Sequence, residues 1–443
     1  MQKTSNRIIV IGGGPAGSTI ASYLAMDGHN VTVFEKEKFP RPHVGESLLP
    51  FNYVIFEELG VLSKMETGFQ RKPGVRFSSS DGENSTVWYF EDVIKDPSSL
   101  SFHVERATFD KMLLDRSKEL GAIVFEETTV KNVEFESDNG DVIVTVKSKT
   151  GEESHHKAKF VIDASGQQTF LANKFRNKEV YEGLDRVAVN SHWINPNYHK
   201  ELKEGCVEII HLGGEKMGWI WAIPLSDTRV SVGVVMSADY FKQQRKKHAG
   251  QKNILDIIYE NELKESSLIS NVLKDAEKEA PAMAHGDYSY YSEDKYGNNF
   301  AIIGDASAFL DPIFSSGIYV AMMSAKFVAE KLNDSFRKNL QPEEELRSVY
   351  EILSGGYDLI EKLIRIFYDP NSISLSDLKN AQDLDFDKFY KAYKIYHFLL
   401  QGDFLVNHKK YSKAADLLKN PKKLDAYKNL VENKESEAIH TYK

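Results

Sequence analysis

The chain has 443 residues, of which 41% are hydrophobic and 27% are charged, and this composition excludes a largely disordered protein. A net charge of −9 argues against a nucleic-acid partner, which would need a basic face. Cys206 is the single cysteine, which excludes an internal disulfide and a thiolate metal cluster and suits a reducing cytoplasm. No stretch approaches the roughly 18 apolar residues of a membrane helix. We therefore expect a cytoplasmic protein without a membrane partner or a metal site.

The first elements in the chain predict a β-turn-α-β unit. Residues 7–11 have the pattern of a buried parallel strand, and a helical segment leads to a second strand that ends at Glu35. Gly12, Gly14 and Gly17 form a GxGxxG pattern between the first strand and the helix. These glycines allow a tight turn, backbone approach to a pyrophosphate and close helix packing, while Glu35 suits ribose hydroxyls. The unit therefore predicts a dinucleotide site.

Later segments add a second kind of architecture. Residues 36–50 lack periodicity and predict a loop, whereas residues 107–120 have helical spacing. Four β-rich segments between about 185 and 235 predict one antiparallel sheet, and two polar helices follow within 237–275. A further buried strand runs into GDAS, a helix begins near Ser316, and the rest is mostly helical.

Three further segments favour FAD over NAD: HVERATFD (103–110), DASG (163–166) and GDASAFLDP (304–312). With them the chain resembles the FAD-dependent aromatic monooxygenase superfamily. The resemblance implies cofactor contacts from Arg106, Gly166 and Asp305. The full set of expected cofactor-binding residues is Gly12, Gly14, Pro15, Ala16, Gly17, Glu35, Lys36, Glu46, Ser47, Arg106, Asp163, Gly166, Gly304, Asp305, Pro312, Gly317 and Ile318.

The order of elements then predicts an α/β fold. We expect a Rossmann-type FAD-binding domain with an inserted antiparallel β-sheet substrate domain and a helical C-terminal region. The FAD-binding domain is expected to be discontinuous, over residues 1–180 and 280–335, with part of the substrate region near 70–105. The substrate domain is expected over 181–279 and the helical region over 336–443.

Within the superfamily the chain resembles the flavin-dependent halogenases. GWIWAIP (218–224) is similar to their WxWxIP motif, GFQRKPGVRF (68–77) to the segment with their essential lysine, and RPHVGESLLP (41–50) to their flavin-gating loop. The resemblance covers roughly the first 330 residues. It implies that FADH2, O2 and chloride or bromide give hypohalous acid, which is guided to Lys72. The passage would be lined by Trp219, Trp221, Ile223, Pro224 and Phe314.

The segment DPIFSSGI (311–318) bears on halide and substrate. Backbone amides of Ser316, Gly317 and Ile318, at a helix start, are expected to hold the halide. Halogenases of free tryptophan resemble this segment but carry a glutamate where this chain has Phe314. Without that carboxylate the substrate must be electron-rich. The resemblance therefore favours the phenol/pyrrole-type branch, with a small aromatic substrate that is free or tethered to an acyl carrier protein, and makes tryptophan an unlikely substrate.

Alternatives remain open at this point. A monooxygenase or dehydrogenase of the same fold would act on an aromatic or isoprenoid substrate, and a flavin-binding scaffold would show no turnover. A lysine such as Lys72, taken without its flanking motif, is most often solvated. No second GxGxxG-type unit is visible, since Gly213-Gly214 and Gly355-Gly356 lack the context. Reduced flavin is therefore expected from a separate flavin reductase, unless a nicotinamide binds transiently on the surface.

Overall fold

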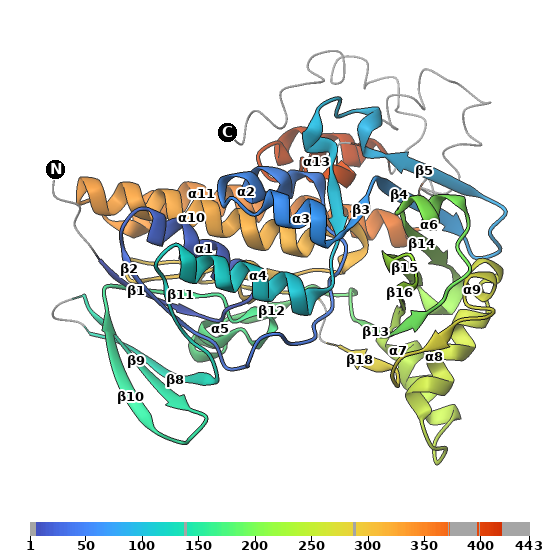
Figure 1. Cartoon of the computed structure of the whole chain (residues 1–443), viewed down its shortest axis with the longest axis horizontal. Coiled ribbons are helices and arrows are strands. Elements are labelled where there is room, and N and C mark those ends of the chain that lie inside the picture. Colours follow the sequence, from blue (N-terminus) through green and yellow to red (C-terminus); the bar gives the residue numbers. More distant parts are fainter. Residues whose placement is uncertain are drawn as a thin grey trace.

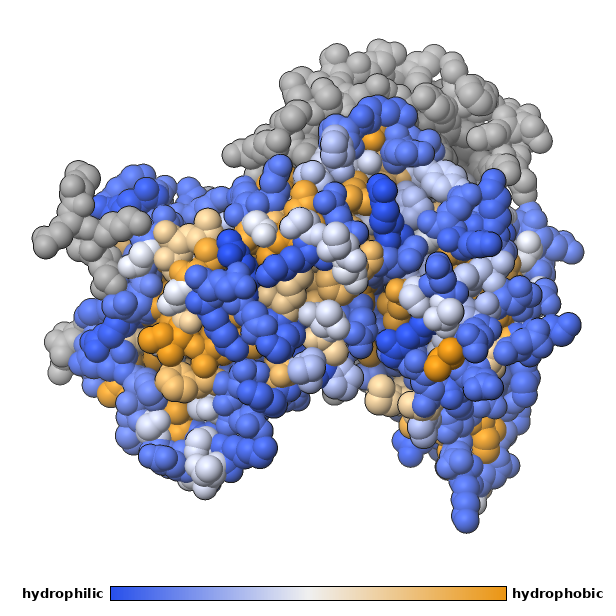
Figure 2. All heavy atoms as spheres, viewed as in Figure 1, coloured by the Kyte–Doolittle hydropathy of each residue, from blue (hydrophilic) through white to orange (hydrophobic). Residues whose placement is uncertain are grey.

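The computed structural model describes residues 6–136, 140–286, 289–370, 372, 397 and 399–418. It consists of two lobes that lie side by side, with a layer of long helices above the first lobe (Figure 1). Figure 2 shows a notch between the lobes and hydrophilic residues over much of the visible face. The parts of the predicted helical region at 373–396 and 419–443 lie outside the described residues.

The first lobe contains a five-stranded parallel sheet. Its strands are β1 (Arg7–Ile11), β2 (Asn30–Phe34), β7 (Ile123–Phe125), β11 (Phe160–Asp163) and β20 (Phe300–Ile302). They lie in the order β20-β11-β1-β2-β7. The apolar run in β1 is buried on both faces, as a covered parallel sheet requires.

Alternation along β1 divides the core into two layers. Ile8 and Val10 pack with the helices, whereas Ile9 and Ile11 pack with a second sheet. The helices are α1 (Pro15–Met26), α4 (Arg106–Glu119), α10 (Ser316–Lys338) and α11 (Pro342–Tyr368). The second sheet is antiparallel, with β8 (Thr128–Phe135), β9 (Val142–Ser148) and β10 (Glu153–Ala158). It hangs below the parallel sheet in Figure 1.

The second lobe is built on an eight-stranded sheet in the order β17-β13-β16-β15-β14-β4-β5, with β18 also paired to β13. The strands are β4 (Gly74–Ser79), β5 (Ser85–Tyr89), β13 (Arg186–Ile194), β14 (Val207–Leu212), β15 (Gly218–Ser226), β16 (Arg229–Ser237), β17 (Glu277–Lys278) and β18 (Met283–His285). The antiparallel pairing expected between 185 and 235 is confirmed. The parallel pairing of β14 with β4 adds residues 74–89 to the same sheet, although these residues belong to a distant part of the sequence.

Three helices cover this sheet where two were expected. They are α7 (Ala238–Lys247), α8 (Ile254–Lys264) and α9 (Ser267–Val272). The additional helix arises because the Ser266 side chain accepts a hydrogen bond from the backbone N–H of Ile269 and so caps a new helix.

The remaining elements are shorter. They are α2 (Tyr53–Glu58), α3 (Leu62–Gly68), β3 (Gln70–Lys72), β6 (Ser101–His103), α5 (Phe170–Phe175), β12 (Lys178–Val180), α6 (Lys200–Glu204), β19 (Tyr290–Ser292), β21 (Ala308–Phe309) and α13 (His408–Leu418). The predicted fold class is thus confirmed, while the domain boundaries stay a prediction. None of the described helices has the length and apolar character needed to cross a membrane.

Candidate functional site

The glycine-rich turn joins β1 to α1 as the sequence predicts. Gly12 has a φ of +100°, and a Cβ there would lie 2.5 Å from the carbonyl oxygen of Ala164. A Cβ on Gly17 would lie 2.0 Å from the carbonyl oxygen of Gly12. Both positions therefore need glycine, the first for the turn and the second for close packing of the helix on the strand.

The turn and the second strand together suit a dinucleotide. No side chain caps the N-terminus of α1, so its first N–H groups are free to face an anion. The buried Glu35 carboxylate accepts hydrogen bonds from the backbone N–H groups of Gly13 (2.6 Å) and Glu37 (2.8 Å). These bonds fix the carboxylate beside the turn, and its remaining lone pairs suit ribose hydroxyls. FAD, the cofactor that the resemblance implies, thus fits the residues present.

A cavity of about 470 Å³ begins at this turn and extends to the sheet of the second lobe. It collects most of the predicted site residues. Those that line it are Gly12, Gly14, Pro15, Ala16, Glu35, Lys36, Glu46, Ser47, Arg106, Gly166, Trp219, Trp221, Ile223, Asp305, Pro312, Gly317 and Ile318. One continuous space therefore joins the expected cofactor residues to the expected passage.

The other predicted residues lie outside the lining of this cavity: Gly17, Lys72, Asp163, Pro224, Gly304, Phe314 and Ser316. Two of them, Asp163 and Gly304, fix the backbone that forms the cavity wall. The Asp163 carboxylate accepts hydrogen bonds from the backbone of Ser165 (2.9 Å) and Leu171 (2.6 Å), which holds the turn after β11. A Cβ on Gly304, whose φ is +58°, would lie 3.1 Å from the Ala16 side chain. These residues shape the cavity wall through the backbone.

Arg106 is anchored beneath the loop at residues 41–50. Its Nε and Nη2 each donate to the buried Asp110 carboxylate at 2.8 Å, and its Nη1 donates to the carbonyl of Val44 at 2.5 Å. The nearby Arg106 charge lowers the pKa of His43 to about 3, so that imidazole is neutral at pH 7. Arg41 also pairs with Asp110, at 3.1 Å. Asp110 thus holds two guanidinium groups at the edge of the cavity.

Asp305 follows β20 and faces the same cavity. Burial raises the pKa of its carboxyl to about 6, against the opposing effect of the Arg106 charge. This carboxyl ionises more readily in the unfolded chain than in the fold. Its ionisation therefore favours the unfolded state and lowers the free energy of unfolding. Stability contributed by Asp305 is therefore fully present below about pH 4 and is lost as pH rises to about 6.

Replacing Asp305 with asparagine should therefore stabilise the flavin-free protein near neutral pH. The gain is at most about 3 kcal/mol above about pH 6, and it should vanish below about pH 3, where both states keep the proton. Urea unfolding of wild type and Asp305→Asn at both pH values measures the difference. An equal difference at the two pH values would contradict the assignment, because it would not depend on ionisation.

Lys72, the predicted catalytic residue, is buried at the end of β3. Its side chain is 2% exposed, and Nζ donates a 2.8 Å hydrogen bond to the carbonyl of Leu48, directly after the cavity-lining Ser47. Nζ also lies 5.4 Å from the centre of the Phe90 ring. Burial lowers the pKa of the amine to about 7, so a large fraction of it is neutral at physiological pH.

The surroundings of Lys72 come from a short antiparallel ribbon. Lys72 in β3 is paired with Ser101 in β6, and Gln70 with His103, which places these side chains on one face. His103 Nε2 lies 2.8 Å from the carbonyl oxygen of Gly205, so Nε2 carries the proton. Its Nδ1 is buried and has no hydrogen-bond partner among the described residues. Burial, and then the charge of Lys72, hold the pKa of His103 well below its usual value.

The two tryptophans of β15 form a wall of the cavity, and β15 lies against β3 and β6. The Trp219 indole donates to Asp311 at 3.1 Å and the Trp221 indole to Ser231 at 3.2 Å, with ring centres 5.6 Å apart. Gly233 stands opposite Trp221 in β16, and a Cβ there would lie 2.1 Å from that indole. The absence of a side chain at 233 therefore sets the position of the Trp221 ring.

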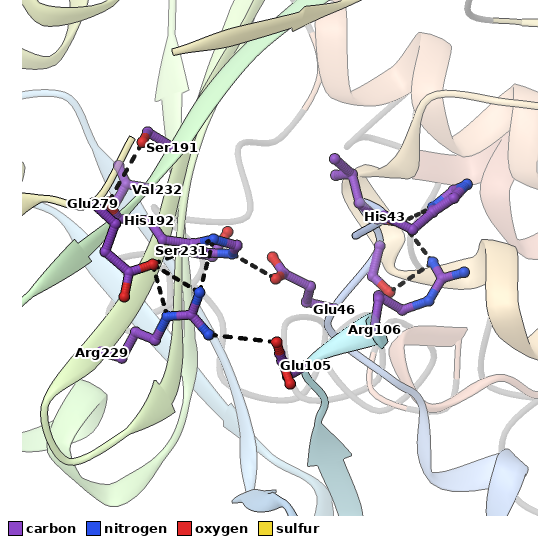
Figure 3. A network of polar contacts seen from close by, with 12 residues as sticks. His43, Glu46, Glu105, Arg106, Ser191, His192, Arg229, Ser231, Val232 and Glu279 are labelled. Atoms are coloured by element: carbon purple, nitrogen blue, oxygen red, sulfur yellow. Dashed lines mark hydrogen bonds and ion pairs between the residues drawn. The ribbon is translucent and has the colours of Figure 1, made fainter. Parts of the chain in front are cut away.

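A polar network bridges the 41–50 loop and the second lobe (Figure 3). Arg229 Nη2 lies 3.3 Å from His192 Nδ1, so the imidazole proton is on Nε2, which donates to Glu46 at 2.7 Å. Arg229 also pairs with Glu279 at 2.7 Å and, more distantly, with Glu105 at 3.8 Å. The Glu46 carboxylate, expected to contact the cofactor, is thus engaged by the sheet while its residue lines the cavity.

The predicted halide position lies at the first turn of α10. Ser315, with a φ of 54°, precedes the helix, and no side-chain hydrogen bond caps it. Ser315, Gly317 and Ile318 line the cavity, whereas the side chain of Ser316 is buried. The residues at the start of this helix therefore border the same space as the tryptophans.

Several cavity residues were not predicted from the sequence. They are contributed by β8, by β14 and by turns near the ends of strands: Arg41, His43, Thr128, Thr129, Val130, Ser165, Val207, Ile209, His285 and Phe309. Val207 and Ile209 had a usable signal, since they alternate on one face of β14 and so point the same way. Within the described residues, no group of three or more His, Cys, Asp or Glu side chains is placed to hold a metal ion.

Comparison with known proteins agrees with this geometry. The family model described as tryptophan halogenase matches residues 7–94 and 83–374. A tryptophan 2-halogenase from Chondromyces crocatus is 34% identical over 384 residues, which are 86% of this chain and 71% of that protein. A 1H-pyrrole-2-carbonyl-[peptidyl-carrier protein] chlorinase from Pseudomonas fluorescens is 34% identical over 354 residues, 75% of this chain and 76% of that protein.

Solved structures resemble the whole chain. A flavoprotein/dehydrogenase from Cytophaga hutchinsonii has a TM-score of 0.82 and 27% identity, covering 95% of this chain and 99% of that one. The flavin-dependent brominase Bmp2 has a TM-score of 0.78 and 26% identity, covering 93% and 98%. The chain therefore belongs to the tryptophan halogenase family and is an FAD-dependent enzyme of the flavin-dependent halogenase group.

Proposed function

We propose that this enzyme halogenates an electron-rich aromatic substrate, a phenol or a pyrrole, with chloride or bromide as the halide. The observation that carries the proposal is the buried Lys72 amine, whose pKa falls to about 7 and which is set apart from the flavin cavity. Such an amine suits an electrophilic halogen, because its neutral form is a nucleophile and its charged form is a hydrogen-bond donor.

The residues around the cavity would hold FAD in an extended pose. Gly12, Gly14 and the N-terminus of α1 would bind the diphosphate, Glu35 the ribose, and Arg106 and Asp305 the region between diphosphate and ring system. When bound in its reduced form, the flavin would supply, with dioxygen, the oxidising power that turns halide into hypohalous acid. The first turn of α10 would hold the halide through the amides of Ser316, Gly317 and Ile318.

The tryptophans would separate this oxidant from the substrate. Trp219 and Trp221 are nearly fully buried and fill the cavity wall next to the ribbon that carries Lys72. A bulky wall there would hinder an organic molecule from reaching the flavin ring and would still admit a small hypohalous acid. Ile223, Pro224 and Phe314 would complete the passage. Lys72 would receive the halogen and present it to the substrate.

The proposed substrate class is supported by the absence of a carboxylate at position 314. Phe314 is an apolar core residue where halogenases of free tryptophan carry a glutamate, so no carboxylate from this position can assist Lys72. A phenol or pyrrole compensates through its own electron density. The chlorinase from Pseudomonas fluorescens acts on a pyrrole bound to a peptidyl carrier protein. We extend this to the present chain as a proposal, with a separate flavin reductase as the supplier of reduced flavin in the cytoplasm.

A single assay tests the function. The purified protein is combined with a flavin reductase, NADH, FAD, halide and a panel of phenols, pyrroles and tryptophan, with pyrrole also offered on a carrier protein. Mass spectrometry should detect a halogen isotope pattern on a phenol or pyrrole and none on tryptophan. Omission of halide should remove the product. An added oxygen atom in place of halogen would refute the proposal.

The flavoprotein/dehydrogenase from Cytophaga hutchinsonii supports a second candidate function. In a dehydrogenase or monooxygenase of this fold, the substrate would lie directly over the flavin and Lys72 would be structural. Product formation would then be independent of halide, and substitution of Lys72 would leave the turnover of that product intact.

A further inference from the structure

A second cavity, which we name the basic cleft, opens beside the proposed flavin site. It has a volume of about 420 Å³ and is lined by Lys36, Glu37, Lys38, Glu127, Thr129, Lys131, Lys147, Ser148 and Lys149. Five lysines thus stand against two glutamates, in a chain whose net charge is −9. The sign of the charge at this place is therefore opposite to that of the whole molecule.

The fold brings these lysines together from three strands. Lys36 follows β2, whereas Lys147 in β9 is paired directly with Thr129 in β8 and so shares its face. The β8–β9 register shifts between Val130 and Asn132, and Lys131 is the residue at that bulge. A bulge changes the direction of a side chain, and here Lys131 joins the lining of the cleft.

Three of the five lysines lack a counter-charge. Lys149 pairs with Glu127 at 2.5 Å and Lys38 with Glu126 at 3.5 Å. Lys36, Lys131 and Lys147 are exposed and form no ion pair with any other described residue. Like charges that converge in a concave place repel one another and raise the local potential. An anionic ligand is the natural complement to such a potential.

The position of the basic cleft indicates which anion it serves. Lys36, Glu37 and Thr129 line both the basic cleft and the flavin cavity, so the two spaces are neighbours. They meet on the side of Glu35, where the ribose of a dinucleotide is expected. The whole-molecule charge of −9 repels an approaching dianion, whereas the basic cleft attracts it to a place beside the flavin cavity.

We propose that the basic cleft is an electrostatic capture site for the diphosphate of an incoming flavin dinucleotide. The inference rests on the proposed function, in which reduced flavin comes from a separate reductase and must be bound again from solution. Capture acts on the encounter: the lysines raise the rate at which the dianion reaches the flavin cavity. Apart from Lys36, which also lines the flavin cavity, they do not hold the flavin once its diphosphate lies on the N-terminus of α1.

Stopped-flow mixing of FAD with the flavin-free protein tests this, through the change in flavin fluorescence. In the triple variant K131Q/K147Q/K149Q, which leaves the cavity-lining Lys36 in place, the association rate constant should fall about tenfold at low ionic strength. The dissociation rate constant should stay within about twofold. Near 1 M salt, where charges are screened within about 3 Å, wild type and variant should associate equally fast.

The matched control is the triple variant K246Q/K247Q/K252Q. These lysines are exposed at the end of α7 and in the turn after it, in the other lobe, and their loss changes the net charge equally. The control should associate with FAD within about twofold of the wild-type rate. Thermal unfolding of all three proteins verifies that each is folded.

Three outcomes would overturn the capture site. Equal slowing in both triple variants would assign the effect to net charge alone. A faster dissociation with unchanged association would mean that the lysines contact bound flavin. Unchanged kinetics with free FAD would mean that they serve another partner, such as an acidic reductase surface.

These outcomes are distinguishable from failure of the proposed function, because flavin association is measured without turnover. Halogenated product with unaltered association in K131Q/K147Q/K149Q removes the capture site alone. Association as expected with no halogenated product removes the proposed function and leaves the site. A wild-type protein that binds no flavin refutes both.

Discussion

Replacement of Lys72 by methionine should lower the yield of halogenated product by at least about 100-fold, while flavin oxidation continues at nearly the wild-type rate. Methionine has a similar length and fills the buried site, but it cannot donate a hydrogen bond to an oxidised halogen. Its thioether consumes one equivalent of hypohalous acid, by oxidation to the sulfoxide, and passes no halogen on in later turnovers. The oxidant would then escape, and a scavenger such as monochlorodimedone should be halogenated in solution. Product yield, oxygen consumption and scavenger absorbance measure the three quantities.

A control separates this role from a general loss of lysine. Lys64 lies on α3, shortly before β3, and its side chain is 52% exposed, so Lys64→Met should keep full activity. The catalytic assignment is wrong if Lys72→Met retains product within about threefold of wild type. It is also wrong if oxygen consumption falls in parallel with the product, because the lysine would then act on the flavin side.

The pH dependence of halogenation distinguishes the two roles left open for the amine. Because burial lowers the pKa of Lys72 to about 7, its charge changes within the accessible range. If the neutral amine bonds to the halogen, the halogenation rate should rise through about pH 7, and if the ammonium donates a hydrogen bond, it should fall. An inflection that persists in Lys72→Met would assign it to another group.

The same pKa has a consequence for stability. In the unfolded chain the Lys72 amine ionises near pH 10.5, whereas in the fold it ionises only near 7. The folded state therefore loses stability as pH falls from about 10 to about 7. Lys72→Met should consequently be more stable than wild type at about pH 6 by a margin that disappears near pH 10.5. Melting temperatures across this range measure the margin.

Gly12→Ala is expected to have the second largest effect, on flavin binding. The new Cβ would lie 2.5 Å from the Ala164 carbonyl oxygen, at a φ of +100° that residues other than glycine rarely adopt. The resulting strain, about 1–3 kcal/mol, falls on the turn that would bind the diphosphate. Fluorescence titration should show FAD affinity reduced at least about tenfold.

Two further glycine variants keep this prediction informative if Gly12→Ala unfolds. A Cβ on Gly14 would have no atom nearer than Arg41 Nη2 at 3.6 Å, so Gly14→Ala should fold normally. The residue lines the cavity, and its methyl group should still lower FAD affinity. Gly213→Ala, with nothing within 4 Å of its Cβ, should leave both properties unchanged. Normal affinity in Gly14→Ala would place the diphosphate elsewhere.

The sequence predicted those parts of the site that depend on neighbouring residues. The GxGxxG turn, Glu35 and the start of α10 follow from local backbone rules, and the structure brings them to one cavity. The alternation of Trp219 and Trp221 likewise gave their common face. The pairing of β4 with β14 depends on segments more than a hundred residues apart, and no periodicity encodes it.

The surroundings of Lys72 were equally beyond a local pattern. Its burial results from the β3–β6 ribbon and the Leu48 carbonyl, which meet only in the fold. Gly233 is an isolated glycine in a strand, a pattern that often marks the close approach of another group, here the Trp221 indole. The sequence alone predicts only separate, solvated lysines for the basic cleft. Their convergence depends on the pairing of β8 with β9 and on the bulge at Lys131.

The bridge between Glu46 and His192 has a consequence for protein engineering (Figure 3). Glu46 belongs to the loop at residues 41–50, which borders the cavity, and His192 belongs to β13 in the sheet of the second lobe. An enzyme with a new substrate range could be sought by exchanging this sheet for that of a relative. If the new sheet has no residue in the place of His192, the buried Glu46 carboxylate loses its hydrogen-bond partner. Such an exchange should therefore include residues 41–50 together with β13 and β16, so that both sides of the contact come from the same parent protein.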